Sequence, residues 1–173
     1  IEQLYSYAQQ ELPIIGLEPS CILTIKDDFA DLTRNPKMEL IAKSCQSFDE
    51  FIAHNLEHFP PSKGQGLVKV HVHCHQKALI GVQPTLKILK NLPEYEIELI
   101  QDGCCGMAGS FGYEKEHYDL SMKIGNLHLF PAIQQSADHQ IVIANGISCR
   151  TQIIQGTQKH PLHLAEFLAS IWV

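Results

Sequence analysis

The stretch Gln101-Asp-Gly-Cys-Cys-Gly-Met-Ala-Gly-Ser-Phe-Gly112 places two adjacent cysteines among closely spaced glycines. Neighbouring side chains in a strand point to opposite faces, so Cys104 and Cys105 can serve one site only in a tight turn. Glycine permits such a turn and lets a bulky ligand approach the backbone closely. The stretch therefore predicts a turn that presents two sulfur atoms to a common metal or iron–sulfur centre.

Two further cysteines lie in similar turns, Cys74 within His-Cys-His and Cys149 within Gly-Ile-Ser-Cys-Arg. A segment typical of a strand precedes each cysteine turn, and helical segments lie between the strands. The expected strands cover 67–73, 95–100 and 140–144, and the expected helices cover 76–92, 113–136, 149–156 and 161–171. This alternation predicts an α/β fold with a parallel sheet flanked by helices. All four cysteines then fall at the carboxyl edge of the sheet, where open α/β sheets place their ligands.

In the N-terminal third, the sequence signals that mark the ends of helices and strands are weaker. Helices are expected over 1–12, 22–34 and 37–58, with a short buried strand over 14–17. Ser20 is a candidate helix cap, and Ser47-Phe-Asp-Glu50 has the pattern of a capping box, which marks a restart within the last helix. Cys45 lies in that helical stretch and is expected to pack in the core.

The loop around 60–66 is the one plausible linker, and it separates a segment 1–60 from a segment 67–173. Aligning Ser20-Cys21 with Ser148-Cys149 also aligns a preceding strand and a following helix. We therefore expect one complete cysteine-rich repeat at 67–173, and at 1–60 the tail of a truncated first repeat plus a helical connection, together forming one compact unit. Cys21 would be the surviving member of a second site; the alternative is that Cys21 is simply a small buried residue.

Composition narrows the function classes. With 173 residues and 45% hydrophobic composition, the chain can bury a real core, and its net charge of −6 argues against nucleic-acid or membrane-surface partners. The sequence has no apolar run near the roughly 18 residues of a membrane span and no signal peptide. It lacks an initiator Met and looks like a piece of something longer. The six cysteines are expected to be reduced metal ligands or redox groups in the cytosol rather than disulfides.

Four thiols suit either a tetrahedral zinc ion or a cysteine-ligated iron–sulfur cluster. Structural zinc sites usually use paired Cys-x-x-Cys knuckles, whereas here three separate turns contribute, which favours a larger cluster. A helix that begins directly after Cys105 is expected to point its positive end at an anionic cluster. Residues close to the cysteines could tune the centre or be ordinary surface groups: His73, His75, Lys77 and Arg150.

Three segments, in this order, resemble a known family: His-Cys-His-Gln-Lys-Ala-Leu, Gly-Cys-Cys-Gly-Met-Ala-Gly-Ser-Phe-Gly-Tyr-Glu and Gly-Ile-Ser-Cys-Arg-Thr-Gln-Ile. They resemble the cysteine-rich (CCG) domain of iron–sulfur oxidoreductases. The resemblance is greatest to the C-terminal part of FAD-linked dehydrogenases of D-2-hydroxy acids such as D-lactate, D-2-hydroxyglutarate and glycolate. It implies an iron–sulfur electron-transfer domain like the glycolate oxidase iron–sulfur subunit, which is not expected to be catalytic alone.

The resemblance also implies that Cys74, Cys104, Cys105 and Cys149 bind a cluster of the 4Fe–4S type. Heterodisulfide reductase subunits of the family carry a further cysteine three residues before the last one, where this chain has Gly146, so a five-cysteine cluster is not expected. The alternatives are a zinc-binding docking module and heterodisulfide-reductase-like thiol–disulfide chemistry. FAD would lie only in the missing part of the protein, and the partners would be a flavin-binding domain or subunit and an electron acceptor. We expect a cytoplasmic location, with attachment to the inner membrane face through partners as an open alternative.

Overall fold

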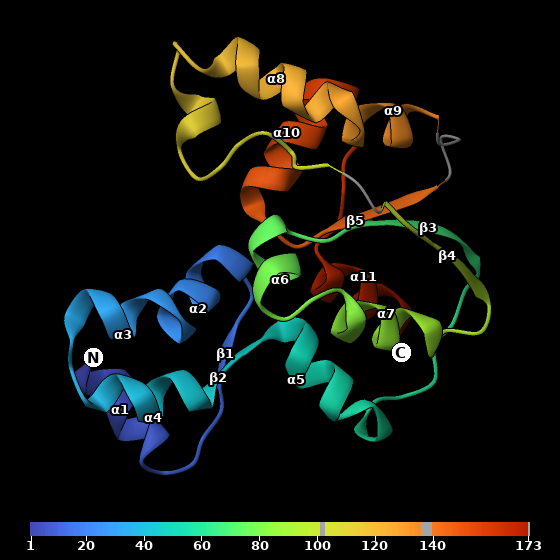
Figure 1. The fold of residues 1–173 in the computed structure, drawn as a ribbon. Coiled ribbons are helices and arrows are strands. Elements are labelled where there is room, and N and C mark those ends of the chain that lie inside the picture. Colours follow the sequence, from blue (N-terminus) through green and yellow to red (C-terminus); the bar gives the residue numbers. More distant parts are fainter. Residues whose placement is uncertain (101–102, 136–139, 173) are drawn as a thin grey trace. The chain divides into compact units, whose positions relative to one another are not determined.

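The computed structural model describes residues 1–100, 103–135 and 140–172 (Figure 1). The chain divides into two compact units. The first contains Ile1–His58 and His75–Ile88, and the second contains Phe59–Cys74 and Leu89–Val173. In both units helices pack on parallel strands, which confirms the predicted α/β class.

The first unit is built on two short parallel strands, β1 (Ile14–Gly16) and β2 (Cys45–Ser47), with Ile15 opposite Gln46. Its core gathers apolar side chains of the surrounding helices and of β2, among them Leu23, Ile41 and Cys45. The helices are α1 (Glu2–Ala8), α2 (Pro19–Lys26), α3 (Asp28–Thr33), α4 (Lys37–Ser44), α5 (Phe48–His54) and η1 (Leu56–His58), and most of α6 (Cys74–Leu79) and of α7 (Gln83–Lys90).

Several expectations for this unit are wrong, and the helix expected over 22–34 is two helices, α2 and α3. The helix expected over 37–58 is interrupted by β2, because Cys45–Ser47 pairs with β1 and buries alternate side chains. Ser20 does not cap a helix, since α2 begins one residue earlier at Pro19 and the Ser20 hydroxyl donates to the Glu18 carboxylate at 2.8 Å. Proline suits the first helical position because its missing N–H would be unsatisfied there anyway.

The capping box at Ser47 is confirmed. The Ser47 hydroxyl accepts from the Glu50 N–H, and the Glu50 carboxylate accepts from the Ser47 N–H at 2.9 Å. A capping residue has extended backbone, so Ser47 can be both the last residue of β2 and the N-cap of α5.

The second unit contains a three-stranded parallel sheet in the order β4-β3-β5. These strands are β3 (Gly66–His71), β4 (Tyr95–Leu99) and β5 (Ile141–Ala144), as the sequence predicted to within a few residues. Figure 1 shows α8 (Tyr118–Leu127), α9 (Leu129–Gln134) and α10 (Ile147–Thr157) on one face of this sheet and α11 (Leu164–Ile171) on the other. The helix predicted over 113–136 is instead two helices, α8 and α9, and the first of them begins at Tyr118. The short helix η2 (Phe111–Tyr113) ends where the prediction began, and residue 136 lies outside the described range.

The central strand β3 is covered on both faces, which accounts for its valine-rich sequence. Val68 and Val70 are fully buried. Lys69 is buried as well, and its ammonium donates to the Ala132 carbonyl at 2.8 Å and pairs with Glu98 at 3.2 Å. The two pairings satisfy a charge that would otherwise be costly to bury.

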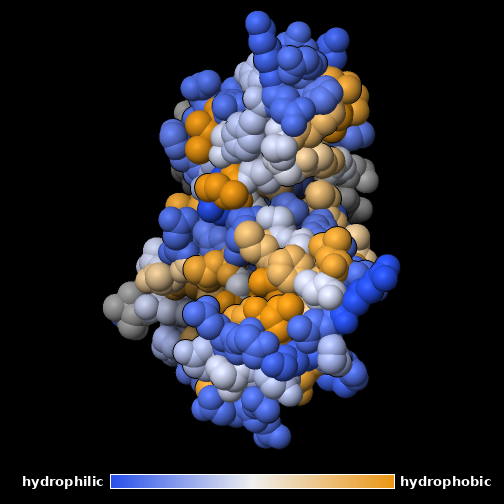
Figure 2. Space-filling model, turned by 90° about the vertical axis from the view of Figure 1, so that its left-hand side faces the viewer, coloured by the Kyte–Doolittle hydropathy of each residue, from blue (hydrophilic) through white to orange (hydrophobic). Residues whose placement is uncertain are grey.

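Within the described ranges, every helix falls short of the length and apolar content that a membrane span requires. Hydrophobic side chains reach the face drawn in Figure 2 in several groups, separated by hydrophilic residues. Scattered apolar groups of this kind are normal on protein surfaces. Surface hydropathy on that face therefore does not single out one docking site.

We predict that Cys45 is the protected thiol of the first unit. Its side chain is 1% exposed, and burial raises the pKa of the thiol from 9.0 to about 11, although Lys26 acts in the opposite direction. Only the thiolate reacts readily with alkylating reagents. In mildly alkaline solution iodoacetamide should therefore label the exposed Cys21 well before Cys45, as peptide mass spectrometry can measure.

The burial of Cys45 also makes the free energy of unfolding depend on pH. Between pH 9.0 and about 11 the thiol is ionised in the unfolded chain but protonated in the folded one, so the free energy of unfolding falls as pH rises through this window. Cys45→Ala should show a smaller decline than the wild type in urea titrations at increasing pH. Equal declines in the two proteins, or equal labelling of Cys21 and Cys45, would contradict a buried thiol.

Candidate metal centre

The glycine-rich loop after β4 takes backbone conformations that few other residues adopt. Gly103 and Gly106 have φ of +90° and +95°, in the left-handed region. A Cβ on Gly106 would also lie 2.2 Å from the carbonyl oxygen of Ser121 in α8. The loop can therefore approach α8 this closely only with glycine at position 106, the residue that directly follows Cys104 and Cys105.

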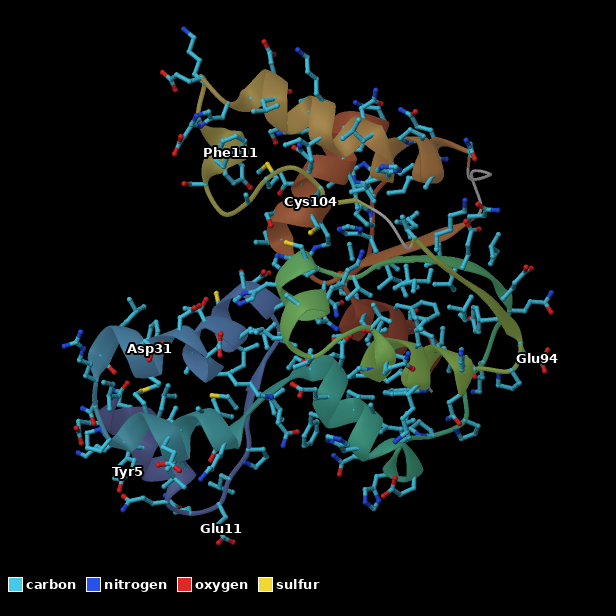
Figure 3. All side chains as sticks on the ribbon, viewed as in Figure 1. Tyr5, Glu11, Asp31, Glu94, Cys104 and Phe111 are labelled. Carbon is cyan, nitrogen blue, oxygen red and sulfur yellow. The ribbon has the colours of Figure 1, made fainter. Side chains whose placement is uncertain are left out.

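The four predicted cysteines lie together in the second unit. The Sγ atoms of Cys105 and Cys149 are 3.5 Å apart, and Cys104 is within hydrogen-bonding reach of both Cys105 and Cys74. Cys105 and Cys149 are buried, Cys104 is half-buried, and Cys74 is exposed. Figure 3 shows the labelled Cys104 on the loop beside α10, with further sulfur atoms close to it. Turns after β3, β4 and β5 thus bring four sulfurs to one edge of the sheet; their role as ligands stays a prediction.

The thiols do not share one protonation state. Hydrogen bonds from Cys105 and then Cys74 hold the pKa of the Cys104 thiol far below its usual range, and the Gly106 N–H contributes at 3.3 Å. A hydrogen bond from Cys105 also lowers the pKa of Cys149, against the effect of its burial. The pKa of Cys105 is raised, because it donates to these neighbours and is buried. Two sulfurs are thus favoured as thiolates, the form that binds metals.

The helix expected directly after Cys105 is not present. The next full helix, α8, begins at Tyr118, and a single backbone N–H, that of Gly106, contacts the Cys104 sulfur instead. The glycine φ angles bend the chain away from a helical path. The helix with a sulfur in its first turn is α10, since Cys149 is its third residue. The positive end of α10 therefore supports a thiolate at Cys149.

One residue near the sulfurs was missed by the sequence reasoning. His71, the last residue of β3, is 2% exposed, and neither of its ring nitrogens has a hydrogen-bond partner among the described residues. The signal was a histidine in a valine-rich buried strand three residues before Cys74. His73 is also buried, and a Cβ on Gly146 would lie 2.5 Å from its ring and 3.3 Å from the Cys149 sulfur. His73 therefore occupies the space that a side chain at position 146 would need.

The remaining candidates lie as follows. The Arg150 guanidinium donates to the carbonyl oxygens of Ala144 and Asn145 at 3.0 and 2.6 Å, so it braces the turn that carries Cys149. His75 and Lys77 are partly exposed and belong to the portion of α6 in the first unit. Cys21 is exposed in α2, also in the first unit. The exposure of Cys21 does not support its alternative reading as a buried core residue.

The donor set fits a metal centre in its chemistry. In a tetrahedral site with metal–sulfur bonds of about 2.3 Å, two sulfurs lie roughly 3.7 Å apart, close to the Cys105–Cys149 separation of 3.5 Å. A buried imidazole without partners adds a nitrogen donor beside them. In the described part of the chain, however, no three His, Cys, Asp or Glu side chains are already arranged to hold a metal ion. Binding would therefore require the thiol side chains to turn from one another toward the metal.

Comparison with known proteins identifies the family. A profile of the cysteine-rich domain named CCG matches residues 68–154. The chain belongs to the CCG family. The match to this CCG domain runs from β3 into α10 and contains all four clustered cysteines, which confirms the family that the motifs indicated.

Two relatives show the context of this CCG domain. One subunit of the anaerobic glycerol-3-phosphate dehydrogenase of Escherichia coli K12 is 27% identical over 163 residues, which cover 88% of this chain and 39% of that protein. The D-2-hydroxyglutarate dehydrogenase of Pantoea ananatis is 26% identical over 165 residues, which cover 90% of this chain and 15% of that protein. The chain thus spans well under half of either relative. No solved structure matches it significantly.

Proposed function

We propose that this chain is an iron–sulfur electron-transfer domain of a flavin-dependent D-2-hydroxy-acid dehydrogenase, similar to the iron–sulfur subunit of glycolate oxidase. The observation that carries the proposal is the convergence of four cysteine sulfurs from three turns, with a 3.5 Å separation between Cys105 and Cys149. Relatives named as dehydrogenases support it. When bound, a 4Fe–4S cluster would accept and release single electrons.

The chain's own residues would do three things for such a cluster. Cys74, Cys104, Cys105 and Cys149 would hold it, and the Gly106 N–H, already directed at the Cys104 sulfur, would stabilise its negative charge. Cys105 and Cys149 are buried and would shield one side of the cluster from water, whereas Cys74 is exposed and would leave the opposite side of the cluster accessible to partners. The sulfur edge near Cys74 is therefore the proposed route for electrons.

The partners would be a flavin-binding domain or subunit and an electron acceptor. The chain covers only 15% of the D-2-hydroxyglutarate dehydrogenase that it resembles, so substrate oxidation and FAD binding would belong to other parts of the complete protein. Isolated from those parts, the domain should carry electrons but oxidise no hydroxy acid.

The direct test is the colour and metal content of protein purified without oxygen. We expect stoichiometric iron and acid-labile sulfide, with a brown absorption band that bleaches on adding dithionite. A colourless protein with about one zinc per chain would instead favour a docking module without redox activity. Protein that binds neither metal, even after reconstitution with iron and sulfide, would refute both.

One observation favours a second candidate, thiol–disulfide chemistry. The Cys105 and Cys149 sulfurs share a hydrogen bond 3.5 Å long, and the pKa of Cys149 is lowered, so a thiolate lies beside a possible partner for a disulfide. Disulfide turnover by metal-free protein, abolished in Cys105→Ser, would support this function. Absence of turnover in the wild type would reject it.

We also propose that the two units contain related repeats. The order α1–β1–α2 in the first unit matches α9–β5–α10 in the second. Cys21 is the third residue of α2, as Cys149 is of α10. Cys21 would then be the member of a second sulfur site that corresponds to Cys149, and the segments 1–60 and 67–173 would hold the tail of one repeat and the whole of the other.

The residue with which each of these strands pairs supports the same correspondence. Ile15 in β1 lies opposite Gln46, and Ile143 in β5 forms a parallel bridge with Leu162. The next residue in each case opens a capping box, Ser47 with Glu50 and His163 with Glu166. In each unit a parallel pairing of that strand is followed directly by a capped helix, as a duplicated unit would have it, although three helices separate β1 from β2 and one helix separates β5 from Leu162.

A further inference from the structure

His71 is a buried polar side chain with no explanation in the fold. It is 2% exposed, and both Nδ1 and Nε2 lack a hydrogen-bond partner in the described part of the chain. A buried polar group that is left unsatisfied destabilises the fold. Such a cost at the last position of the central strand, where an apolar residue would fit the valine-rich sequence, indicates a function for the imidazole.

The position of His71 ties it to the sulfur atoms. In the sheet His71 is opposite Ala144, the last residue of β5, and the turn after β5 carries Cys149. On the other side of β3, the Ile100 N–H bonds to the Val70 carbonyl at 2.9 Å, just before the loop with Cys104. His71 thus lies between the two sulfur-bearing turns, close enough to influence both Cys104 and Cys149 electrostatically.

We propose that His71 supplies a nitrogen ligand to the metal centre, beside the cysteine sulfurs. The inference rests on the metal centre of the proposed function and adds to it a mixed sulfur–nitrogen donor set. A role limited to hydrogen bonding with the thiolates would leave both ring nitrogens without a bond of normal geometry, although the ring is within hydrogen-bonding reach of the Cys149 sulfur. Imidazole binds iron and zinc alike, so the donor suits either metal.

His73 is the natural competitor and the matched control. It is similarly buried, at 7% exposed, and lies in the same motif two residues further on. Its ring, however, has interactions of its own and packs against Gly146 at the start of α10. The two histidines therefore differ in their hydrogen bonding, since of the two only His71 has both ring nitrogens without a hydrogen-bond partner among the described residues.

X-ray absorption at the metal edge tests the proposal whether iron or zinc is bound. The anaerobically purified chain should show a nitrogen shell at about 2.0–2.1 Å in addition to sulfur at about 2.3 Å, with imidazole outer-shell scattering. His71→Asn should lose the nitrogen shell and its outer-shell signature. His71→Cys should retain the metal with sulfur only. His73→Asn should keep the wild-type spectrum.

The outcomes separate this inference from the proposed function. A sulfur-only first shell in the wild type overturns the nitrogen ligand, while iron–iron scattering in the same spectrum would leave the cluster intact. Loss of the nitrogen shell in His73→Asn but not in His71→Asn also overturns it. Wild-type protein without bound metal contradicts both proposals. If His71→Asn fails to fold by circular dichroism, the wild-type and His71→Cys spectra still decide.

Discussion

Cys149→Ser is expected to strip the domain of its iron. Cys149 is 1% exposed, its sulfur is 3.5 Å from that of Cys105, and its pKa is lowered, so it is the buried thiolate best prepared for metal. Loss of even an outer-shell partner typically costs about 10–100-fold in metal affinity, and loss of a ligand should cost at least as much. Iron and sulfide analysis of anaerobically purified protein measures the effect.

The chain offers a matched control in Cys45. It is also 1% exposed but belongs to the core of the first unit, whereas the four clustered cysteines belong to the second unit. Cys45→Ala should retain full iron with only reduced stability, as expected when a small buried side chain loses its sulfur. Equal iron in Cys149→Ser and wild type, or equal loss in the two variants, would remove Cys149 from the metal site.

Gly106→Ala should be the most damaging single-methyl change in the cysteine loop. Its φ of +95° is strained for alanine, and the new Cβ would lie 2.2 Å from the Ser121 carbonyl oxygen, a backbone atom that cannot move without shifting α8. Strained backbone costs of order 1–3 kcal/mol, and overpacking adds typically 1–3 kcal/mol. We therefore expect the free energy of unfolding, measured in urea, to fall by about 3 kcal/mol or more.

Gly109→Ala separates the cost of backbone strain from the cost of the steric clash. Gly109 also has positive φ, +67°, but a Cβ there meets no atom within 4 Å. In this variant the free energy of unfolding should fall only by the cost of backbone strain, about 1–2 kcal/mol. A Gly106→Ala protein as stable as Gly109→Ala would show that the loop does not rest against α8 at this point, and the placement of Cys104 and Cys105 would then need revision.

Short-range signals predicted much of the fold. The valine-rich segment before Cys74, the strand before the cysteine pair and the strand before Cys149 all lie where periodicity and turn residues placed them. The capping box at Ser47 was legible too, because it consists of two side chains three residues apart. Features of this kind depend on neighbours in the chain, so the sequence displays them directly.

The predictions failed where contacts with a segment distant in sequence determine the local structure. Cys45–Ser47 has helical neighbours on both sides, and only its pairing with β1, some thirty positions earlier, makes it a strand. The glycine loop continues as an irregular turn because the Ser121 carbonyl in α8 occupies the space beside Gly106. Local propensity is a weak prior that such long-range packing overrides.

The sequence by itself determined which atoms could form the site: cysteines that directly follow strands, glycines that permit tight turns, and the family to which these motifs belong. Only the tertiary structure decided how they meet. It placed the Cys105 and Cys149 sulfurs 3.5 Å apart, left Cys74 exposed, and set His71 without partners beside them. The reason is physical: a residue's chemistry is carried in its side chain, whereas its burial and its partners depend on backbone that folds in from elsewhere in the chain.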